Sequence, residues 1–117
     1  MAVIPAVIDS SIGIENALSV TWTEVTDGDT CEPYSFSKLA QAVSVHVTGT
    51  FGSATVVFAQ SNVVGVAGPD AVDLDGATIS ITAAALTEIR DRSRIVTPEH
   101  SGGGGTQDLD ISMVVLF

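Results

Sequence analysis

Basic residues are scarce in this sequence, which has 117 residues with 4 lysines and arginines against 14 aspartates and glutamates and a formal net charge of −10. Nucleic-acid binding depends on lysine and arginine side chains that neutralise phosphates, so we expect no nucleic-acid partner. Charged residues of either sign make up only 15% of the chain, whereas apolar residues make up 45%. A chain with so few charges is expected to bury part of its surface against other proteins.

Cysteine is almost absent, because Cys31 is the only one. An internal disulfide is therefore excluded, and no oxidising compartment is implied. No apolar run approaches the roughly 18 residues of a membrane span. The opening stretch MAVIPAVIDSSIGIENALSV lacks the basic residues of a signal peptide, and Pro5 and Asp9 interrupt its apolar residues. We expect no membrane partner and synthesis in a cytoplasm.

The sequence also lacks the combinations of residues that catalysis needs. Its two histidines, His46 and His100, lie far apart in the chain, and neither has a context with Cys31 that predicts a nucleophile beside its base. Two isolated histidines give no zinc spacing either. We therefore predict no enzyme activity, no catalytic residue and no cofactor.

The aspartates of PDAVDLDG, residues 69–76, match the middle of an EF-hand calcium loop. The first and twelfth positions of that loop would be Ala71 and Thr82, which provide no carboxylate. We interpret the stretch as a solvated turn and predict no metal site. The alternative is a weak calcium site that also uses Asp70.

Four consecutive glycines, residues 102–105, resemble a phosphate-binding loop only superficially. Such a loop leads into a helix whose N–H groups face the anion, but this run leads into TQDLDISMVVLF, an apparent strand with two aspartates. We predict a flexible hairpin loop.

Apolar residues are abundant, and along several runs they alternate with polar residues at period two. This alternation is typical of β-strands with one buried face. Glycine-bearing turn sequences separate the runs, and GTFGS, residues 49–53, is predicted to close a hairpin. This pattern predicts an all-β fold, an antiparallel β-sandwich of jelly-roll or immunoglobulin-like type. The apolar residues predicted to share buried faces are Leu18, Val20, Trp22, Val43, Val45, Val47, Ala54, Val56, Phe58, Leu109, Ile111, Met113, Val115 and Phe117.

The stretch ITAAALTEIRDRSR is compatible with a short helix and with an extended strand. Three consecutive alanines and apolar residues spaced at four predict a short helix or irregular piece near residues 82–91. The same stretch, residues 81–94, contains three of the four lysines and arginines of the chain, which are Arg90, Arg92 and Arg94. In an extended strand they would point the same way and form a contact for an acidic neighbour, such as another copy of this chain. The alternative is a solvated edge that pairs with local acids.

The stretch GDTCEPYSFSKLAQAVSVHVTGTFGSATVVFAQSN resembles a group of small virion proteins of tailed bacteriophages. Members share GDT.EP, then V.V.GTFG.ATV and SN, and close with R.I.P, sGG.GT and DL; the likeness covers roughly residues 18–116. The matching positions are 28–30, Glu32, Pro33, Val45, Val47, 49–52, 54–56, Ser61, Asn62, Arg94, Ile95, Pro98, 101–103, Gly105, Thr106, Asp108 and Leu109.

The resemblance implies a β-sandwich structural protein, specifically a capsid decoration (cement) protein that binds the outer surface of the head and stabilises the shell. Its partners would be the major capsid protein and other copies of itself, as a homotrimer. It would lie on the capsid surface of the virion after synthesis in the host bacterial cytoplasm. The alternatives are a tail or baseplate component and a small carbohydrate- or ligand-binding β module.

The sequence departs from this family in its loops. Thr97 stands where arginine is common, Gly104 where aspartate or asparagine is common, and the loop after Asn62 lacks the family's acid and tryptophan. That loop is unusually apolar, so we predict that Val63, Val64 and Val66 form an interface. Residues 1–14 precede the family pattern and are expected to be an extended arm that adds a strand to a neighbour, or else the first strand of the sandwich domain 15–117. The arm's predicted contact residues are Val3, Ile4, Val7 and Ile8.

Overall fold

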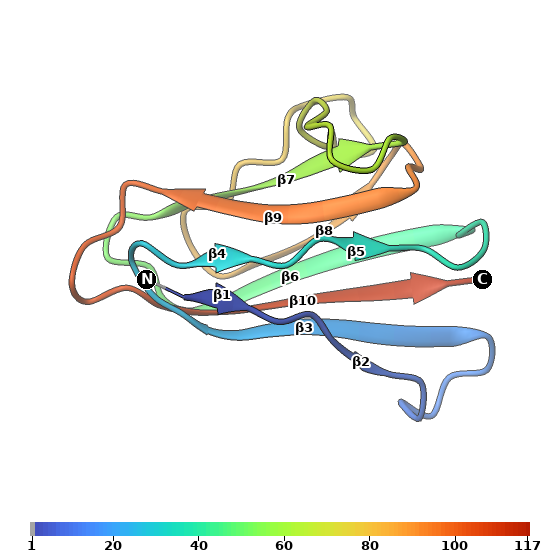
Figure 1. The fold of residues 1–117 in the computed structure, drawn as a ribbon, viewed down its shortest axis with the longest axis horizontal. Coiled ribbons are helices and arrows are strands. Elements are labelled where there is room, and N and C mark those ends of the chain that lie inside the picture. Colours follow the sequence, from blue (N-terminus) through green and yellow to red (C-terminus); the bar gives the residue numbers. More distant parts are fainter. Residues whose placement is uncertain (1) are drawn as a thin grey trace.

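Three long strands with alternating apolar residues form the centre of the larger sheet in the computed structural model, which describes residues 2–117. They are β3 (Ala17–Val25), β10 (Asp108–Leu116) and β6 (Ala42–Thr50). Two shorter strands, β2 (Val7–Asp9) and β8 (Ala85–Ile89), form the edges and give the order β2-β3-β10-β6-β8 (Figure 1). All four pairings in this sheet are antiparallel.

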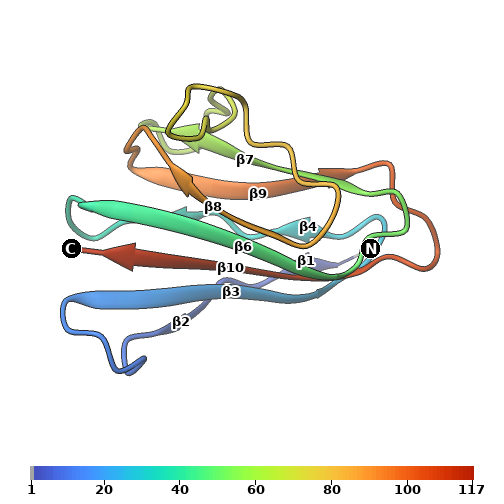
Figure 2. The same ribbon diagram turned by 180° about the vertical axis from the view of Figure 1, so that it is seen from behind.

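A smaller antiparallel sheet packs on the first, and its strand order is β5-β9-β7 (Figure 2). Its strands are β5 (Tyr34–Ser35), β9 (Ile95–Ser101) and β7 (Thr55–Ser61). The two-residue strands β1 (Val3–Ile4) and β4 (Thr30–Cys31) pair in parallel beside the two sheets. The predicted β-sandwich is therefore confirmed.

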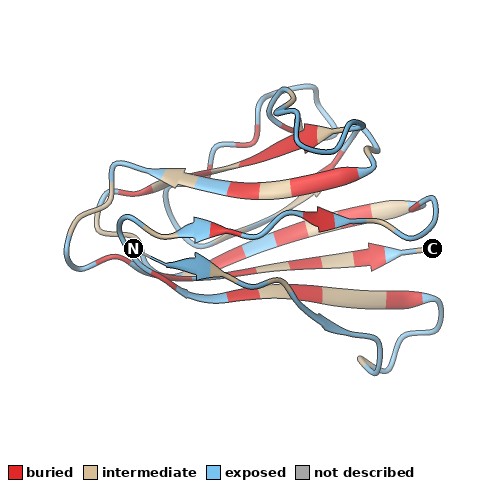
Figure 3. Ribbon diagram, viewed as in Figure 1, coloured by how far each residue is buried: buried red, intermediate tan, exposed pale blue. Residues whose placement is uncertain are grey.

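The core lies between the sheets, and the predicted period-two faces supply it (Figure 3). Trp22 of β3, Phe58 of β7 and Met113 of β10 are fully buried there. The indole Nε1 of Trp22 donates a hydrogen bond of 2.9 Å to the carbonyl oxygen of Glu32, so its polar group is also satisfied. Of the predicted apolar faces only Leu18 and Phe117, at strand ends, are half-buried.

The two predicted hairpins are wrong, because both connections cross from one sheet to the other. Residues 49–53 join β6 of the larger sheet to β7 of the smaller one, and the glycine run 102–105 joins β9 to β10. The crossings pack against each other at one end of the sandwich. Gly49 has φ +108, and a Cβ there would overlap the carbonyl oxygen of Asp108, so this close approach requires glycine.

The short helix expected near residues 82–91 is also wrong. Residues 82–84 form a bend, and β8 then pairs with β6 from Val47↔Ala85 to Val43↔Ile89. Ile89 is buried in the core while Leu86 points outward, 70% exposed. Pairing with β6 and burial of Ile89 outweigh the helix preference of three alanines, because propensity differences are only tenths of a kcal/mol per residue.

Residues 3–9 pair with strands of their own domain. Val3 and Ile4 lie opposite Thr30 and Cys31, and β2 pairs with β3 over Val7↔Thr21 to Asp9↔Ser19. Their side chains contribute little to the core, because among them only Ile4 and Ala6 are half-buried against it.

Candidate functional site

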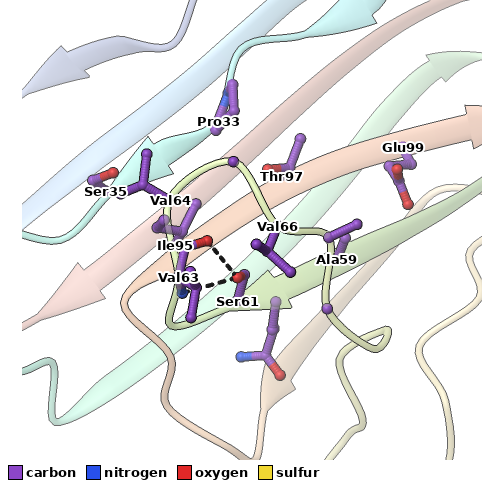
Figure 4. A pocket seen from close by; sticks show the side chains of 14 residues that line it. Pro33, Ser35, Ala59, Ser61, Val63, Val64, Val66, Ile95, Thr97 and Glu99 are labelled. Carbon is purple, nitrogen blue, oxygen red and sulfur yellow. Dashed lines mark hydrogen bonds between the residues drawn. The ribbon is translucent and has the colours of Figure 1, made fainter.

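The most exposed apolar loop, residues 62–68, folds over the outer face of the smaller sheet; we call it the valine loop. Val63, Val64 and Val66 are 56%, 68% and 57% exposed. Beneath them lies a hollow of about 270 Å³, whose floor is formed by β7, β9 and Pro33 (Figure 4). The Oγ of Ser61 accepts a hydrogen bond from the amide of Val63 at 3.0 Å and donates one to its carbonyl at 2.8 Å, which fixes the start of the loop.

The far end of the valine loop is fixed by close backbone contact. A Cβ at Gly68 would overlap the carbonyl oxygen of Gln60. The side chain of Gln60 is buried, and its Nε2 donates to the carbonyl of Asp91 at 2.7 Å and to Ser93 Oγ at 3.2 Å. Gln60 thus contacts the valine loop through its backbone and Asp91 and Ser93 through its side chain.

Next to the valine loop is a second hollow of about 280 Å³, lined by Phe36, Lys38, Leu39, Asn62, Arg92, Ser93 and Arg94. We call it the basic hollow, because it contains three of the four bases of the chain. The guanidinium of Arg92 donates two hydrogen bonds to the carbonyl oxygen of Gln41, one of them at 3.0 Å. The amide of Arg94 donates to Asn62 Oδ1 at 2.9 Å. Leu39 is 81% exposed at its rim.

The prediction that three arginines point the same way is wrong for Arg90. Residues 90–94 form a loop rather than an extended strand, and the guanidinium of Arg90 contacts Asp91 at 3.0 Å. The hydrogen bond and charge of Asp91, together with the charge of Asp73, raise the pKa of Arg90. Arg90 is therefore locally neutralised and lies outside the basic hollow.

Lys38 is the member of the hollow that sequence reasoning missed. It is isolated in the sequence, and only the pairing of β5 with β9, Ser35↔Ile95, brings its loop beside Arg92 and Arg94. Its Nζ also lies 5.1 Å from the centroid of the Phe117 ring. No local signal in the sequence could have found this grouping.

Three of the four predicted N-terminal interface residues are exposed, and none of the four joins the valine loop. Val3, Val7 and Ile8 are 67%, 54% and 55% exposed, and Ile4 is half-buried. They lie on β1 and β2, and β2 forms the edge of the larger sheet beyond β3 (Figure 1). Whether they bind a neighbour stays a prediction.

Cys31 and His100 line one further hollow, together with Asp29 and Glu99. Both imidazole nitrogens of His100 are engaged: Nε2 with the carbonyl of Asp29 at 2.6 Å, and Nδ1 with the Nε2 of Gln107 at 2.8 Å. Burial, and next the charge of Asp29, raise the pKa of the Cys31 thiol to about 11. The thiol therefore stays protonated at neutral pH, and the imidazole is not positioned as its base.

The aspartates of residues 69–76 build a turn. The Oδ1 of Asp73 accepts hydrogen bonds from the amides of Asp75 at 2.9 Å and Ala77 at 3.0 Å. Within residues 2–117, no three histidine, cysteine, aspartate or glutamate side chains are placed to hold a metal ion together. The same part of the chain contains no helix of the length and hydropathy that membrane crossing requires.

Comparison with known proteins identifies no relative: no family model, curated protein or solved structure matches this chain. The proposals below are therefore based on the sequence patterns and on the geometry of the valine loop and the basic hollow.

Proposed function

We propose that this chain is a structural protein of the tailed-bacteriophage virion, and specifically a decoration protein that binds the outside of the head and stabilises the shell. One observation of the structure supports this most. The valine loop exposes three large apolar side chains next to a hollow that holds three of the four lysines and arginines of an acidic molecule. Such a combination is typical of a protein contact surface.

The motifs of the phage resemblance have structural roles that fit a rigid platform. Asp29 of the GDT motif accepts hydrogen bonds from the amide and hydroxyl of Thr26 at 3.0 and 2.7 Å, and from the amide of Ala2 at 2.9 Å. These bonds hold the pKa of Asp29 below its usual value, with those from Thr26 contributing most. Gly49 of the GTFG motif permits the close approach of β6 to the backbone of Asp108 in β10.

A ligand-binding module is the less favoured alternative. The hollow beneath the valine loop, about 270 Å³, is slightly smaller than typical small-molecule sites, and none of its lining residues is aromatic. Sugar sites commonly stack an aromatic ring on the ligand. A surface that contacts the major capsid protein and, as a homotrimer, other copies of this chain explains the exposed valines better than a ligand does.

The test is co-sedimentation of the purified protein with undecorated heads, and separately with tails, of the phage that encodes it. We expect saturable binding to heads, which Val63→Asp with Val66→Asp weakens by about tenfold or more because each buries an unpaired charge. The matched control, Leu74→Asp with Leu86→Asp, introduces the same charges at residues 61% and 70% exposed elsewhere and should bind normally. Binding to tails alone would instead support the tail or baseplate alternative.

A further inference from the structure

Acidic residues gather at one end of the sandwich. β3 ends and β10 begins there, with Leu109 opposite Val25 and Asp108 opposite Thr50. We call this the acidic end. Five acids lie at the end of β3, in the turn that follows it and at the start of β10: Glu24, Asp27, Asp29, Asp108 and Asp110. His100 contacts the carbonyl oxygen of Asp29 there.

The basic hollow lies at the opposite end. Leu116, which ends β10, is opposite Ala17 and Ala42, and Ser61 is opposite Ile95 beside the hollow. The strands of both sheets run along the longest dimension of the molecule, 38 Å, so strand length separates the two charged ends (Figure 1). The basic hollow and the acidic end thus lie at opposite ends of the strands.

Lys38 and Arg94 of the basic hollow are available for pairing, whereas the guanidinium of Arg92 already donates to the carbonyl oxygen of Gln41. Arg90 with Asp91 forms the one salt bridge within residues 2–117, so Lys38, Arg92 and Arg94 have no acidic partner there. At the acidic end, the turn 26–29 joins β3 to β4, and Asp27 on it is exposed. The carboxylate of Asp29 accepts hydrogen bonds from Thr26 within the turn, and these bonds hold the turn in its conformation.

We propose that the basic hollow of one copy binds the acidic end of a second copy, with the turn 26–29 seated between Lys38 and Arg94. The carboxylate of Asp27 would accept hydrogen bonds from these cations, and Phe36 and Leu39 would surround the turn as part of the lining of the hollow. Because different surfaces meet, the contact is head-to-tail and repeats until a ring closes or a fibre grows. This inference goes beyond the proposed function and does not depend on where the protein acts.

A second copy fits better than a free anion because of the overall charge. A molecule of net charge −10 repels dissolved anions, whereas its two ends attract each other at contact. The molecular centres would be about one molecular length apart, 38 Å, which is more than four Debye lengths at physiological salt. The general repulsion is then screened, while the paired charges in contact are screened much less.

The test is sedimentation velocity of the purified protein, with two neutralised variants. Lys38→Ser with Arg94→Ser removes the basic side, and Asp27→Asn with Asp108→Asn removes the acidic side. We expect the wild-type protein to associate, and each variant alone to associate about tenfold more weakly or not at all. Asp70→Asn with Asp75→Asn changes the net charge as much as the acidic-end variant and should associate like the wild type.

An equimolar mixture of the two defective variants provides the decisive measurement. Each retains one intact half of the contact, so the mixture should form a dimer that neither forms alone. The inference is overturned if the wild-type protein is monomeric at every salt concentration, if either variant associates normally, or if the mixture stays monomeric. Because only purified protein is used, failure here is distinguishable from failure to bind heads.

Discussion

At the scale of the residue, glycine positions determine whether the two sheet crossings can pack. Gly49 combines a positive φ with contact to the backbone of Asp108, whereas Gly104 in the glycine run has open space around it. Glycines in the two crossings thus have different constraints. The sequence alone does not distinguish them, because the constraint on Gly49 comes from Asp108 of the neighbouring strand β10.

We predict that Gly49→Ala lowers the free energy of unfolding by about 3 kcal/mol, because both the backbone conformation and the contact with Asp108 become strained. Gly104→Ala should change it by less than about 0.5 kcal/mol. Urea unfolding of both variants measures this. Equal effects would show that Gly49 does not approach the backbone of Asp108 as closely as described.

Cys31 should make stability depend on alkaline pH. Its pKa is about 11 in the folded protein against an ordinary 9.0, so the unfolded chain loses the thiol proton first. The stabilising contribution is complete below pH 9, falls as pH rises, and is lost by about pH 11. We predict that Cys31→Ala reduces the slope of unfolding free energy against pH between these values. Urea unfolding of the wild-type protein and the variant across that pH range measures the two slopes. Identical slopes for the two proteins would contradict the prediction.

At the scale of the element, the sequence predicts faces better than partners. Val43, Val45 and Val47 alternate with polar residues, and all three are buried as expected. The same pattern cannot show which strand pairs with β6, because a short glycine link suits a hairpin and a sheet crossing equally. The helix prediction failed for a related reason: β8 forms through pairing with a strand about forty residues earlier.

The N-terminal strands should contribute stability without being required for folding. These strands contribute few buried side chains. However, the amides of Thr30 and Glu32 donate hydrogen bonds of 2.9 Å to the carbonyl oxygens of Ala2 and Ile4. We predict that deleting residues 2–9 lowers the free energy of unfolding by about 3 kcal/mol and leaves a cooperatively folded β protein. Circular dichroism with urea unfolding tests this. An unfolded product would mean that the segment is an integral part of the sandwich.

At the scale of the whole molecule, the net charge governs how two copies approach each other. For two chains of charge −10 with centres 38 Å apart, Coulomb repulsion in pure water is about 11 kcal/mol, and physiological salt reduces it to below about 1 kcal/mol. In pure water the repulsion between the two net charges therefore exceeds the few kcal/mol that ion pairs at the rim of the contact provide. Salt therefore has two opposite effects on association.

We predict that association is strongest at intermediate salt. Below about 0.02 M the unscreened net charge should keep chains apart, and above about 0.5 M the contact pairs should weaken. Sedimentation velocity across this range measures it. A monotonic increase with salt would indicate an apolar contact instead of the charged one.

The central claim, that this protein stabilises a phage head, is tested most directly by calorimetry of the shell. Undecorated heads would be heated alone and with increasing amounts of the purified protein. We predict that the melting temperature of the shell rises by several degrees and that the rise saturates at a fixed ratio of copies to capsid subunits. An unchanged melting temperature at saturating protein would contradict it.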